Sequence, residues 1–479
     1  MFRRVAIIGG GAAAVALLSE LVERASAPLH LDWYTGGAAQ PGRGLAYGTT
    51  SARHLLNVRA ATMGMFSRKP RGFLDFAQRA DPNAAGTDFL PRRLYGDYLE
   101  EEAARALAQS RQRRVDVRVV PFAVDALVPE TDGVTVIQGE RASRADAAVL
   151  AIGALPVRPL AGVDDALVAD GRYVLAPWEF LAQAPADDAP REVALVGLGL
   201  TAVDMLLELA VRWPNAHFTA VSRHGHLPAA HLPLSTEPDD DGRALVEAMH
   251  EIPELRRWLR LLREAIASTD DWRVVIDSLR PYTPNLWGAL PMAERARFLR
   301  HARWAWERAR HRMAPQVQQE LLALERDGRL RRVSGRVVGA RAHGQRVLLE
   351  IRQPGASTAL PADLAIQTIG LDTDLRATAH PLMRQLVTNG HVTPDPLGLG
   401  CQATTEGQLC RDGTPWPRLF ATGSLLRGAR WESTAMPEIR LQARQLAGRL
   451  LEPGERRGER ATATGKLEAL ASGAGRLAR

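Results

Sequence analysis

The chain has 479 residues, which is too long for one ordinary hydrophobic core and predicts two or three domains. Hydrophobic residues make up 46% of it and charged residues 24%, a balance that excludes a disordered or fibrous chain. The net charge of +7 suits anions of several kinds, from nucleic acid to a small acidic substrate. Cys401 and Cys410 are too few for a disulfide framework and too far apart for a redox dithiol, so a reducing cytoplasm is the expected location.

The N-terminus imitates a signal peptide, because Arg3 and Arg4 precede a run of small and apolar residues. The same residues, RRVAIIGGGAAAVALLSEL, also predict a strand, a glycine turn and a helix. Cleavage would remove this strand and turn. We therefore expect them to stay in the mature protein.

A second strand, glycine turn and helix are predicted nearly two hundred residues later, in REVALVGLGLTAVDMLLEL. In such a turn the first glycine permits the tight bend, the second lets the backbone approach a pyrophosphate, and a small residue keeps helix and strand close. The helix N-terminus offers free N–H groups to the phosphates. The residues expected in these roles are Gly9, Gly11 and Ala14 in the first copy and Gly197 and Gly199 in the second.

Each copy is followed, further along the chain, by the same predicted elements. Residues 113–153 and 330–370 both alternate apolar and polar positions around turn signals, which predicts a small β-meander, and both end on a buried strand and a glycine. A late segment, PRLFATGSLLRGARWESTAMPEIRLQARQLAGRLL, predicts a returning strand, a loop and a helix from about Pro437. The expected fold is α/β, with two Rossmann-like domains, the second inserted in the first.

About ninety residues from Pro238 to Asp327 have helical periodicity and hold five of the ten tryptophans. A plain dinucleotide-binding domain does not need them, so this helical insert is the expected substrate region. On a helix Arg303, Trp306 and Arg310 share one face, where an indole and two guanidinium groups can hold a flat anion. Tryptophans at this spacing are, however, more often core residues.

Six stretches carry a resemblance to a known family: GRGLAYG (42–48), HLLNV (54–58), FLPRRLYGDYL (89–99), GLGLTAVD (197–204), HRMAP (311–315) and WESTAMPEIR (431–440). Together they resemble, along almost the whole chain, the bacterial FAD/NAD(P)-binding family that includes the FAD-dependent urate hydroxylase and the L-aspartate N-monooxygenase. The resemblance implies that the first domain binds FAD and the inserted domain binds NADPH or NADH. The expected boundaries are 1–190 and 371–453 for the FAD domain, 191–370 for the NAD(P)H domain with its insert at about 238–327, and 454–479 for a disordered tail.

The resemblance also implies site residues. It places Gly44, Asn57, Gly423 and Ser424 at FAD, in addition to the first glycine turn. The substrate-binding residues are expected to be Arg280, Trp287, Arg303, Trp306 and Arg310. No histidine has a metal-ligand pattern around it, so no metal is expected.

The residues at the ends of two predicted strands bear on how each dinucleotide is held. Where the family usually has an acidic residue for the FAD ribose the chain has Thr35, and Asp32 is expected to point elsewhere. After the second strand of the inserted domain, Arg223 is placed where a guanidinium can pair with the 2′-phosphate of NADPH. NADPH is therefore favoured, with NADH left open.

The function implied is that of a flavin-dependent monooxygenase, in which NAD(P)H reduces FAD and the reduced flavin activates O₂ for transfer to the substrate. Urate, a flat anion, is the preferred substrate and would give 5-hydroxyisourate in purine catabolism. The alternative is an N-hydroxylase of an amino acid or amine such as L-aspartate, which would use the arginines. A more remote alternative is a nucleotide-binding regulator or RNA-binding protein, but no RNA-recognition motif supports it, and neither nucleic acid nor a membrane is an expected partner. The oligomeric state is left open.

Overall fold

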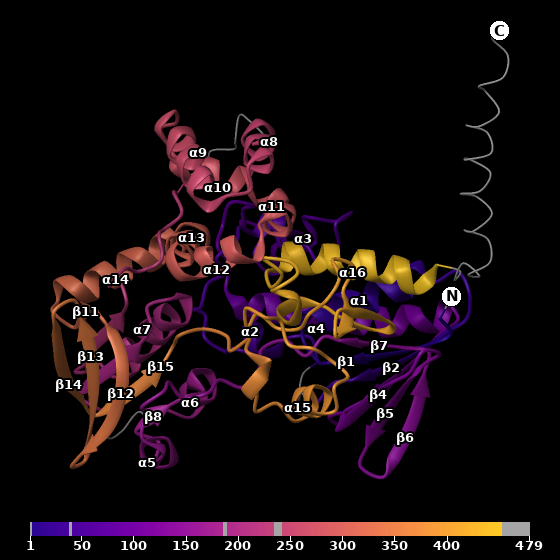
Figure 1. The fold of residues 1–479 in the computed structure, drawn as a ribbon, viewed down its shortest axis with the longest axis horizontal. Helices are drawn as coiled ribbons and strands as arrows, with labels where there is room; N and C mark the ends of the chain where they lie inside the picture. The colour runs from indigo at the N-terminus through magenta and orange to yellow at the C-terminus, as the bar shows by residue number, and fades with distance from the viewer. Residues whose placement is uncertain (1, 38–40, 185–188, 234–241, 453–479) are drawn as a thin grey trace, which may run out of the picture.

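The computed structural model describes residues 2–37, 41–184, 189–233 and 242–452. The first domain is built on a six-stranded sheet of order β16-β17-β7-β1-β2-β3 (Figure 1). All pairs in it are parallel except β16 with β17. Its strands are β1 (Arg4–Ile8), β2 (Leu29–Tyr34), β3 (Val115–Val120), β7 (Ala147–Leu150), β16 (Gln408–Arg411) and β17 (Thr414–Ala421).

The central strands of this sheet are apolar along their whole length because both faces are covered. In β7 every residue is buried, which is the pattern of a parallel strand between two layers. Helices α1 (Ala12–Arg24), α4 (Arg92–Gln112) and α16 (Met436–Leu451) contribute to the core on one face. The small antiparallel sheet of β4 (Ala126–Pro129), β5 (Val134–Gln138) and β6 (Arg141–Ala145) contributes to a second core with α15 (Pro381–Thr388).

The second domain is built on a five-stranded parallel sheet of order β11-β10-β9-β15-β8. Its strands are β8 (Tyr173–Val174), β9 (Glu192–Val196), β10 (His217–Ser222), β11 (Leu330–Ser334) and β15 (Leu364–Gln367). The antiparallel sheet of β12 (Arg336–His343), β13 (Arg346–Gln353) and β14 (Ala356–Ala362) lies beside it (Figure 1). The returning strand β17 completes the first sheet, so the predicted insertion of one domain in the other is confirmed.

Two predicted boundaries are wrong. The first domain was expected to run to residue 190, but β8 pairs with β15, so the chain enters the second domain before Tyr173. The insert was expected to reach Asp327, but α14 (Pro315–Arg326) packs with α7 (Leu200–Arg212) in the core of the second domain. Both errors have the same cause. A two-residue strand such as β8, or a helix at the end of a segment such as α14, belongs to the domain that it packs against, and its own sequence does not show which domain that is. The predicted tail, 454–479, lies outside the described residues.

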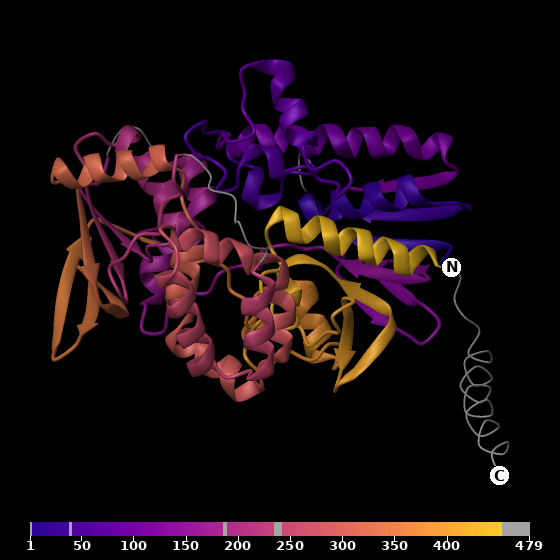
Figure 2. The same cartoon turned by 90° about the horizontal axis from the view of Figure 1, so that it is seen from above.

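The insert itself is a group of helices that stands against both domains (Figure 2). Part of its core is contributed by Leu399 and Trp431 of the first domain. Its helices are α8 (Arg243–Glu251), α9 (Leu255–Ala267), α10 (Trp272–Ser278), α11 (Thr283–Ala289), α12 (Met292–His301) and α13 (Arg303–Arg310), with a 3₁₀ turn at Arg280–Tyr282. The remaining helices are α2 (Gly44–Tyr47), α3 (Gly72–Ala80), α5 (Asp165–Ala169) and α6 (Pro177–Gln183), with 3₁₀ turns at Ala60–Thr62, Leu375–Ala377 and Gly423–Leu426.

Candidate functional site

The two glycine turns have the same geometry. Gly9 follows β1 with φ of +133°, and a Cβ there would lie 2.1 Å from the Ala151 carbonyl oxygen. Gly197 follows β9 with φ of +116°, and a Cβ there would lie 2.7 Å from the Thr368 carbonyl oxygen. Only glycine fits either position without displacing the neighbouring strand end. The predicted duplication is therefore present in three dimensions.

Each turn leads into a helix whose N-terminus has no side-chain cap. Gly11 is the N-cap of α1 and Gly199 is the N-cap of α7, and neither can offer a side-chain acceptor to the first-turn N–H groups. Such an N-terminus suits the phosphates of a dinucleotide. Gly44 lies against Gly11, and Ala14 is fully buried behind the turn. These residues fit the pyrophosphate of FAD at the first turn.

The end of β2 lacks the usual acidic residue. Thr35 is buried, and its backbone N–H donates to the carbonyl of Val120 at 2.9 Å. The carboxylate of Asp32 accepts from Nε of Arg4 at 2.7 Å. Asp32 was predicted to point away from the ribose position, and the structure places its carboxylate in an ion pair with Arg4.

The end of β17 lies beside the end of β7. Gly423 N–H and the Thr422 hydroxyl both donate to Oε1 of Gln442 on α16, at 2.9 and 3.0 Å. The Ser424 hydroxyl donates to the carbonyl of Gly153. Gly423 and Ser424 thus occupy the carboxyl edge of the first sheet, the edge at which such sheets bind ligands.

A wide cavity of about 740 Å³ lies at the second glycine turn, and we call it the nucleotide cleft. Gly197, Gly199 and Arg223, the residues predicted to bind NAD(P)H, line it, and Arg223 is exposed. Helix α13 forms an opposite wall, where Trp304 stacks on His224 with ring centroids 4.1 Å apart. The other contributing residues include Arg303, Glu307, Arg308, His311, Arg336, Arg427, Glu432, Ser433 and Thr434.

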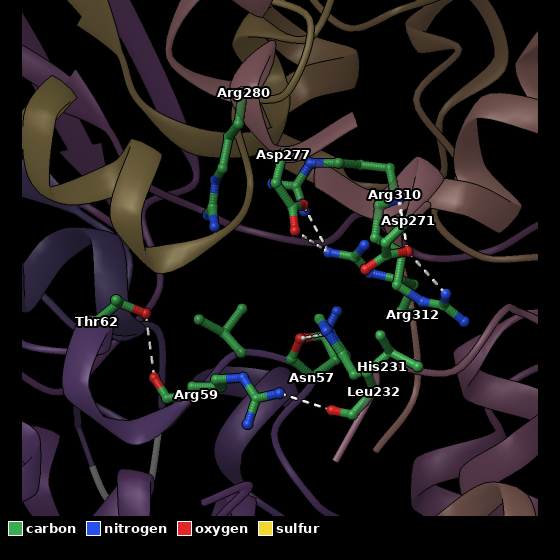
Figure 3. A pocket seen from close by; sticks show the side chains of 12 residues that line it. Asn57, Arg59, Thr62, His231, Leu232, Asp271, Asp277, Arg280, Arg310 and Arg312 are labelled. Carbon is green, nitrogen blue, oxygen red and sulfur yellow. Dashed lines mark hydrogen bonds and ion pairs between the residues drawn. The ribbon is translucent and has the colours of Figure 1, made fainter. Parts of the chain in front are cut away.

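A second cavity, of about 190 Å³, is lined by Arg310 at the C-terminal end of α13, and we call it the arginine cavity (Figure 3). Four segments far apart in the sequence form it: the loop after β2, the loop after β10, the α10 region of the insert and the end of α13. Its lining residues are Asn57, Val58, Arg59, Thr62, His231, Leu232, Asp271, Arg273, Asp277, Arg280, Arg310 and Arg312.

Four of the five arginines in this cavity are paired with carboxylates. Arg280 makes two hydrogen bonds to Glu438, at 2.7 and 3.1 Å, and Arg310 lies 3.0 Å from Glu432. Two further pairs, at 2.6 and 3.0 Å, join Arg312 to Asp277 and Arg273 to Asp271. Figure 3 shows the Arg312–Asp277 pair at the edge of the open space.

The fifth arginine, Arg59, donates to the backbone carbonyls of Thr87 and Leu232 at 2.6 and 2.7 Å. Its guanidinium lies over the ring of Phe89 at 4.8 Å. No carboxylate within the described part of the chain pairs with it. Burial, together with the nearby Arg312, lowers the pKa of Arg59 from its usual value.

Glu432 connects the two cavities. It lines the nucleotide cleft, while its carboxylate pairs with Arg310 of the arginine cavity and accepts from Nε1 of Trp306 at 2.9 Å. Burial alone would raise its pKa, but the charges of Arg310 and His311 outweigh burial and lower it. Its φ of +47° is a left-handed conformation that a non-glycine residue adopts at some cost.

Histidine 231 is neutral in the arginine cavity. Burial and the charge of Arg312 lower its pKa to about 4. Its Nε2 lies 3.1 Å from the carbonyl of Asn57, so the neutral ring donates a hydrogen bond there. This contact joins the second domain to the loop that carries the predicted FAD-binding residue Asn57.

The structure separates the five predicted substrate-binding residues. Arg280 and Arg310 line the arginine cavity, whereas Arg303 lines the nucleotide cleft and pairs with Glu307 at 2.9 Å. The single face predicted for Arg303, Trp306 and Arg310 is therefore not one wall of one pocket. The two arginines, two turns apart on α13, line different cavities and pair with different carboxylates.

The two predicted tryptophans have packing roles. Trp287 is only 3% exposed, stacks on Trp431 with centroids 5.0 Å apart, and donates from Nε1 to the Gly428 carbonyl at 2.8 Å. Trp306 packs against the same core and is held by Glu432. Neither residue is among the lining residues of the two described cavities, so both substrate-binding predictions are corrected.

Sequence reasoning missed several lining residues. His231 lies in a loop without a distinctive pattern, whereas Arg59 directly follows the stretch HLLNV, which drew attention to Asn57 but not to the arginine. Arg312 lies in the stretch HRMAP, and Trp304 is adjacent to the helix face that was singled out, so a weak signal existed for both. The sequence does not show which carboxylates face each arginine in the folded protein, so it could not show which arginines line a cavity.

Within the described ranges, no group of three or more histidine, cysteine or carboxylate residues is placed to hold a metal ion. Both cysteines are buried and free. No helix in the same ranges is long and apolar enough to cross a membrane.

Comparison with known proteins finds a family match within the first domain. Residues 6–155 match a family described as FAD-NAD(P)-binding. No curated protein sequence matches the chain. The family match covers the first glycine turn and ends just after β7.

Solved structures resemble the chain over nearly its whole length. An ornithine N-hydroxylase from Kutzneria sp. 744, with reduced FAD, NADP+ and L-ornithine, has a TM-score of 0.64 at 17% identity, covering 94% of this chain and 99% of its own. The L-lysine 6-monooxygenase from Pseudomonas syringae has a TM-score of 0.61 at 18% identity, covering 94% and 99%. A cadaverine monooxygenase from Erwinia amylovora, bound to FAD, has a TM-score of 0.61 at 13% identity, covering 95% and 97%. At these identities the likeness shows a shared two-domain fold.

Proposed function

We propose that the protein is an FAD- and NADPH-dependent monooxygenase that N-hydroxylates a small amine or amino acid. The overall reaction would consume the amine, O₂, NADPH and a proton, and would give the hydroxylamine, water and NADP+. Bound FAD would supply the activation of O₂. The chain's own residues would hold the two dinucleotides, orient the amine and exclude water.

The observation that carries the cofactor assignment is the pair of glycine turns. Both leave space only for a hydrogen at the first glycine, and both lead into a helix N-terminus free of side-chain caps. The match of residues 6–155 supports FAD at the first turn. Arg223 at the second turn supports NADPH over NADH, because a guanidinium can pair with a 2′-phosphate.

N-hydroxylation is favoured over the urate hydroxylation expected from the sequence. The three enzymes whose solved structures are described above act on ornithine, lysine and cadaverine. Their similarity extends over almost the whole of this chain. The tryptophans that were expected to stack on urate also pack in the insert. A stacking surface for a flat ring was the main reason for preferring urate.

The test is a product assay on purified, FAD-loaded protein with NADPH and O₂. A panel of amines and amino acids, with urate as a separate sample, would be screened for substrate-dependent NADPH oxidation and analysed by mass spectrometry. The proposal predicts a hydroxylamine from at least one amine. Formation of 5-hydroxyisourate from urate, with no amine oxidised, would contradict it.

The control is Gly9→Val, which places a side chain against the Ala151 carbonyl. This variant should lose the flavin absorbance and the activity together. An active variant without flavin would show that the chemistry does not depend on FAD.

A further inference from the structure

The part of the nucleotide cleft around Arg223 carries positive charge that no described carboxylate offsets. Arg223, Arg308 and Arg336 all line the cleft, are exposed, and make no ion pair with another described residue. The two carboxylates among the lining residues, Glu307 and Glu432, are paired with other arginines. The three exposed guanidinium groups are therefore available to an anionic ligand.

A flat aromatic surface lies beside these arginines. The indole of Trp304 on α13 stacks on His224 with ring centroids 4.1 Å apart and planes 27° apart, and its centroid lies 6.1 Å from that of His226. Both histidines are exposed, and all three rings line the cleft. Unlike Trp287 and Trp306, Trp304 is not part of the described core of the insert. Such a surface suits the stacking of another flat ring.

Backbone hydrogen bonds hold the insert against the loop that carries Arg223. The N–H of Ala229, in the loop after β10, donates to the carbonyl of Arg308 at 3.0 Å, and the N–H of Met313, just after α13, donates to the carbonyl of Ala229 at 2.8 Å. Trp304 and Arg308 are four residues apart on α13, so their side chains lie on the same side of the helix. An indole and a guanidinium of the insert therefore line the same part of the cleft as Arg223.

The adenosine end of NADPH has the combination of groups that this part of the cleft suits. It has a flat adenine ring and, on the adjoining ribose, a 2′-phosphate that NADH lacks. In a Rossmann-like domain this ribose is contacted from the end of the second strand, which here is β10, immediately before Arg223. The pyrophosphate belongs at the glycine turn, and Gly197 and Gly199 line the same cleft.

We infer that the helical insert completes the nucleotide site, with the adenine of NADPH stacked on Trp304 and its 2′-phosphate bound by Arg308 together with Arg223. This inference rests on the proposed use of NADPH, and it gives the insert, which was expected to be the substrate region, a second role. Burial and the charge of Arg223 lower the pKa of His224, so the ring that stacks on Trp304 is neutral at pH 7 and the arginines supply the charge for the phosphate. Discrimination between NADPH and NADH is thus shared by the second domain and the insert.

The test is isothermal titration of the FAD-loaded protein with NADPH, NADH and adenosine 2′,5′-bisphosphate. Arg308→Gln should weaken binding of NADPH and of the bisphosphate about tenfold and leave NADH unchanged, because it removes one charged contact to the 2′-phosphate. Arg300→Gln is the matched control and should bind all three ligands as the unaltered protein does, because Arg300 is exposed on α12 and does not line the cleft. Unchanged binding of the bisphosphate by Arg308→Gln, or an equal loss of NADH binding, would overturn the assignment of Arg308 to the 2′-phosphate.

A change at Trp304 should affect every adenine nucleotide alike. Trp304→Leu removes the stacking surface, so the Kd values for NADPH, NADH and the bisphosphate should each rise about tenfold, whereas Trp304→Phe keeps an aromatic ring and should recover most of the loss. If Trp304→Leu does not retain FAD, His224→Ala takes its place, because it removes the exposed partner of the same stack and should also weaken all three ligands. Unaltered affinity in these variants would overturn the stacking of adenine on Trp304.

The inference and the proposed function fail in different ways. Adenosine 2′,5′-bisphosphate has no nicotinamide and cannot reduce the flavin, so its binding does not depend on the reaction. If it binds through Trp304 and Arg308 but no amine is hydroxylated, the inference stands and N-hydroxylation is wrong. If an amine is hydroxylated with the same KM for NADPH by the unaltered protein, Arg308→Gln and Trp304→Leu, N-hydroxylation stands and the inference is wrong.

Discussion

The two cavities that residues of α13 line both contain arginines, but they use them differently. In the arginine cavity, four of the five are paired with carboxylates at 2.6–3.0 Å. In the nucleotide cleft Arg303 and Arg427 pair with Glu307, whereas Arg223, Arg308 and Arg336 are exposed and make no ion pair with another described residue. Paired arginines are held in place for a small ligand, whereas unpaired ones can follow the phosphates of a larger and more extended one.

The largest effect on stability is expected from a substitution that breaks the buried ion pair of Arg310 and Glu432. Arg310→Met leaves Glu432 buried without its cation, and loss of one partner of a buried pair costs about 3–5 kcal/mol. We expect the free energy of unfolding, measured by urea denaturation of the FAD-loaded protein, to fall by about that amount.

Arg303→Met is the control on the same helix. Arg303 and Glu307 are each about one-third exposed, so the expected loss is below about 1 kcal/mol. Similar losses in both variants would mean that the two arginines of α13 are not held differently.

A change at the second glycine turn should affect only the nucleotide cleft. Gly197→Ala forces a Cβ toward the Thr368 carbonyl at positive φ, a strain of about 1–3 kcal/mol. Flavin reduction by NADPH, followed by stopped-flow absorbance, should slow by about 10- to 100-fold, while the FAD content stays unchanged. Gly344→Ala is the control, because Gly344 also has positive φ but has open space around it. Loss of FAD in Gly197→Ala alone would contradict the separation of the two sites.

His231 gives the arginine cavity a dependence on pH. Its pKa of about 4 in the folded protein is below the usual value of 6.5, so the unfolded chain binds more protons between these values. Stability is therefore lost as pH falls below about 6.5. Relative to His231→Gln, the unaltered protein should lose about 2 kcal/mol in unfolding free energy between pH 7 and pH 5. Parallel pH profiles of the two proteins would show that the ring is not kept neutral by burial.

Arg223 should show the smallest of these effects. Arg223→Ala removes a charged contact to the 2′-phosphate, so the Kd for NADPH should rise about tenfold while that for NADH does not change. Titration of both nucleotides into the FAD-loaded protein measures the difference. An equal effect on both nucleotides would assign Arg223 to a phosphate that they share.

The sequence predicts the features of the fold that depend on local residue patterns. The two glycine turns, the order of elements after them and the return through β17 all follow from residues close together in the chain. The short strand β8 was not predicted, because two residues carry no periodicity and acquire their role only by pairing with β15.

The arginine cavity could not be predicted in the same way. It joins Asn57, His231 and Arg312, which come from three separate segments. Whether Arg280 and Arg310 face a ligand or are paired depends on Glu438 and Glu432, which lie more than a hundred residues further along the chain. The same holds for Trp287, whose partner Trp431 lies in the returning segment.

The most direct test of the account is a competition for oxygen. The FAD-loaded protein would be given NADPH, isotopically labelled dioxygen and an equimolar mixture of L-aspartate, L-ornithine, cadaverine and urate, and the products would be identified by mass spectrometry. The account predicts one labelled oxygen atom on the nitrogen of an amine or amino acid. Labelled urate, with no label on any amine, would contradict it.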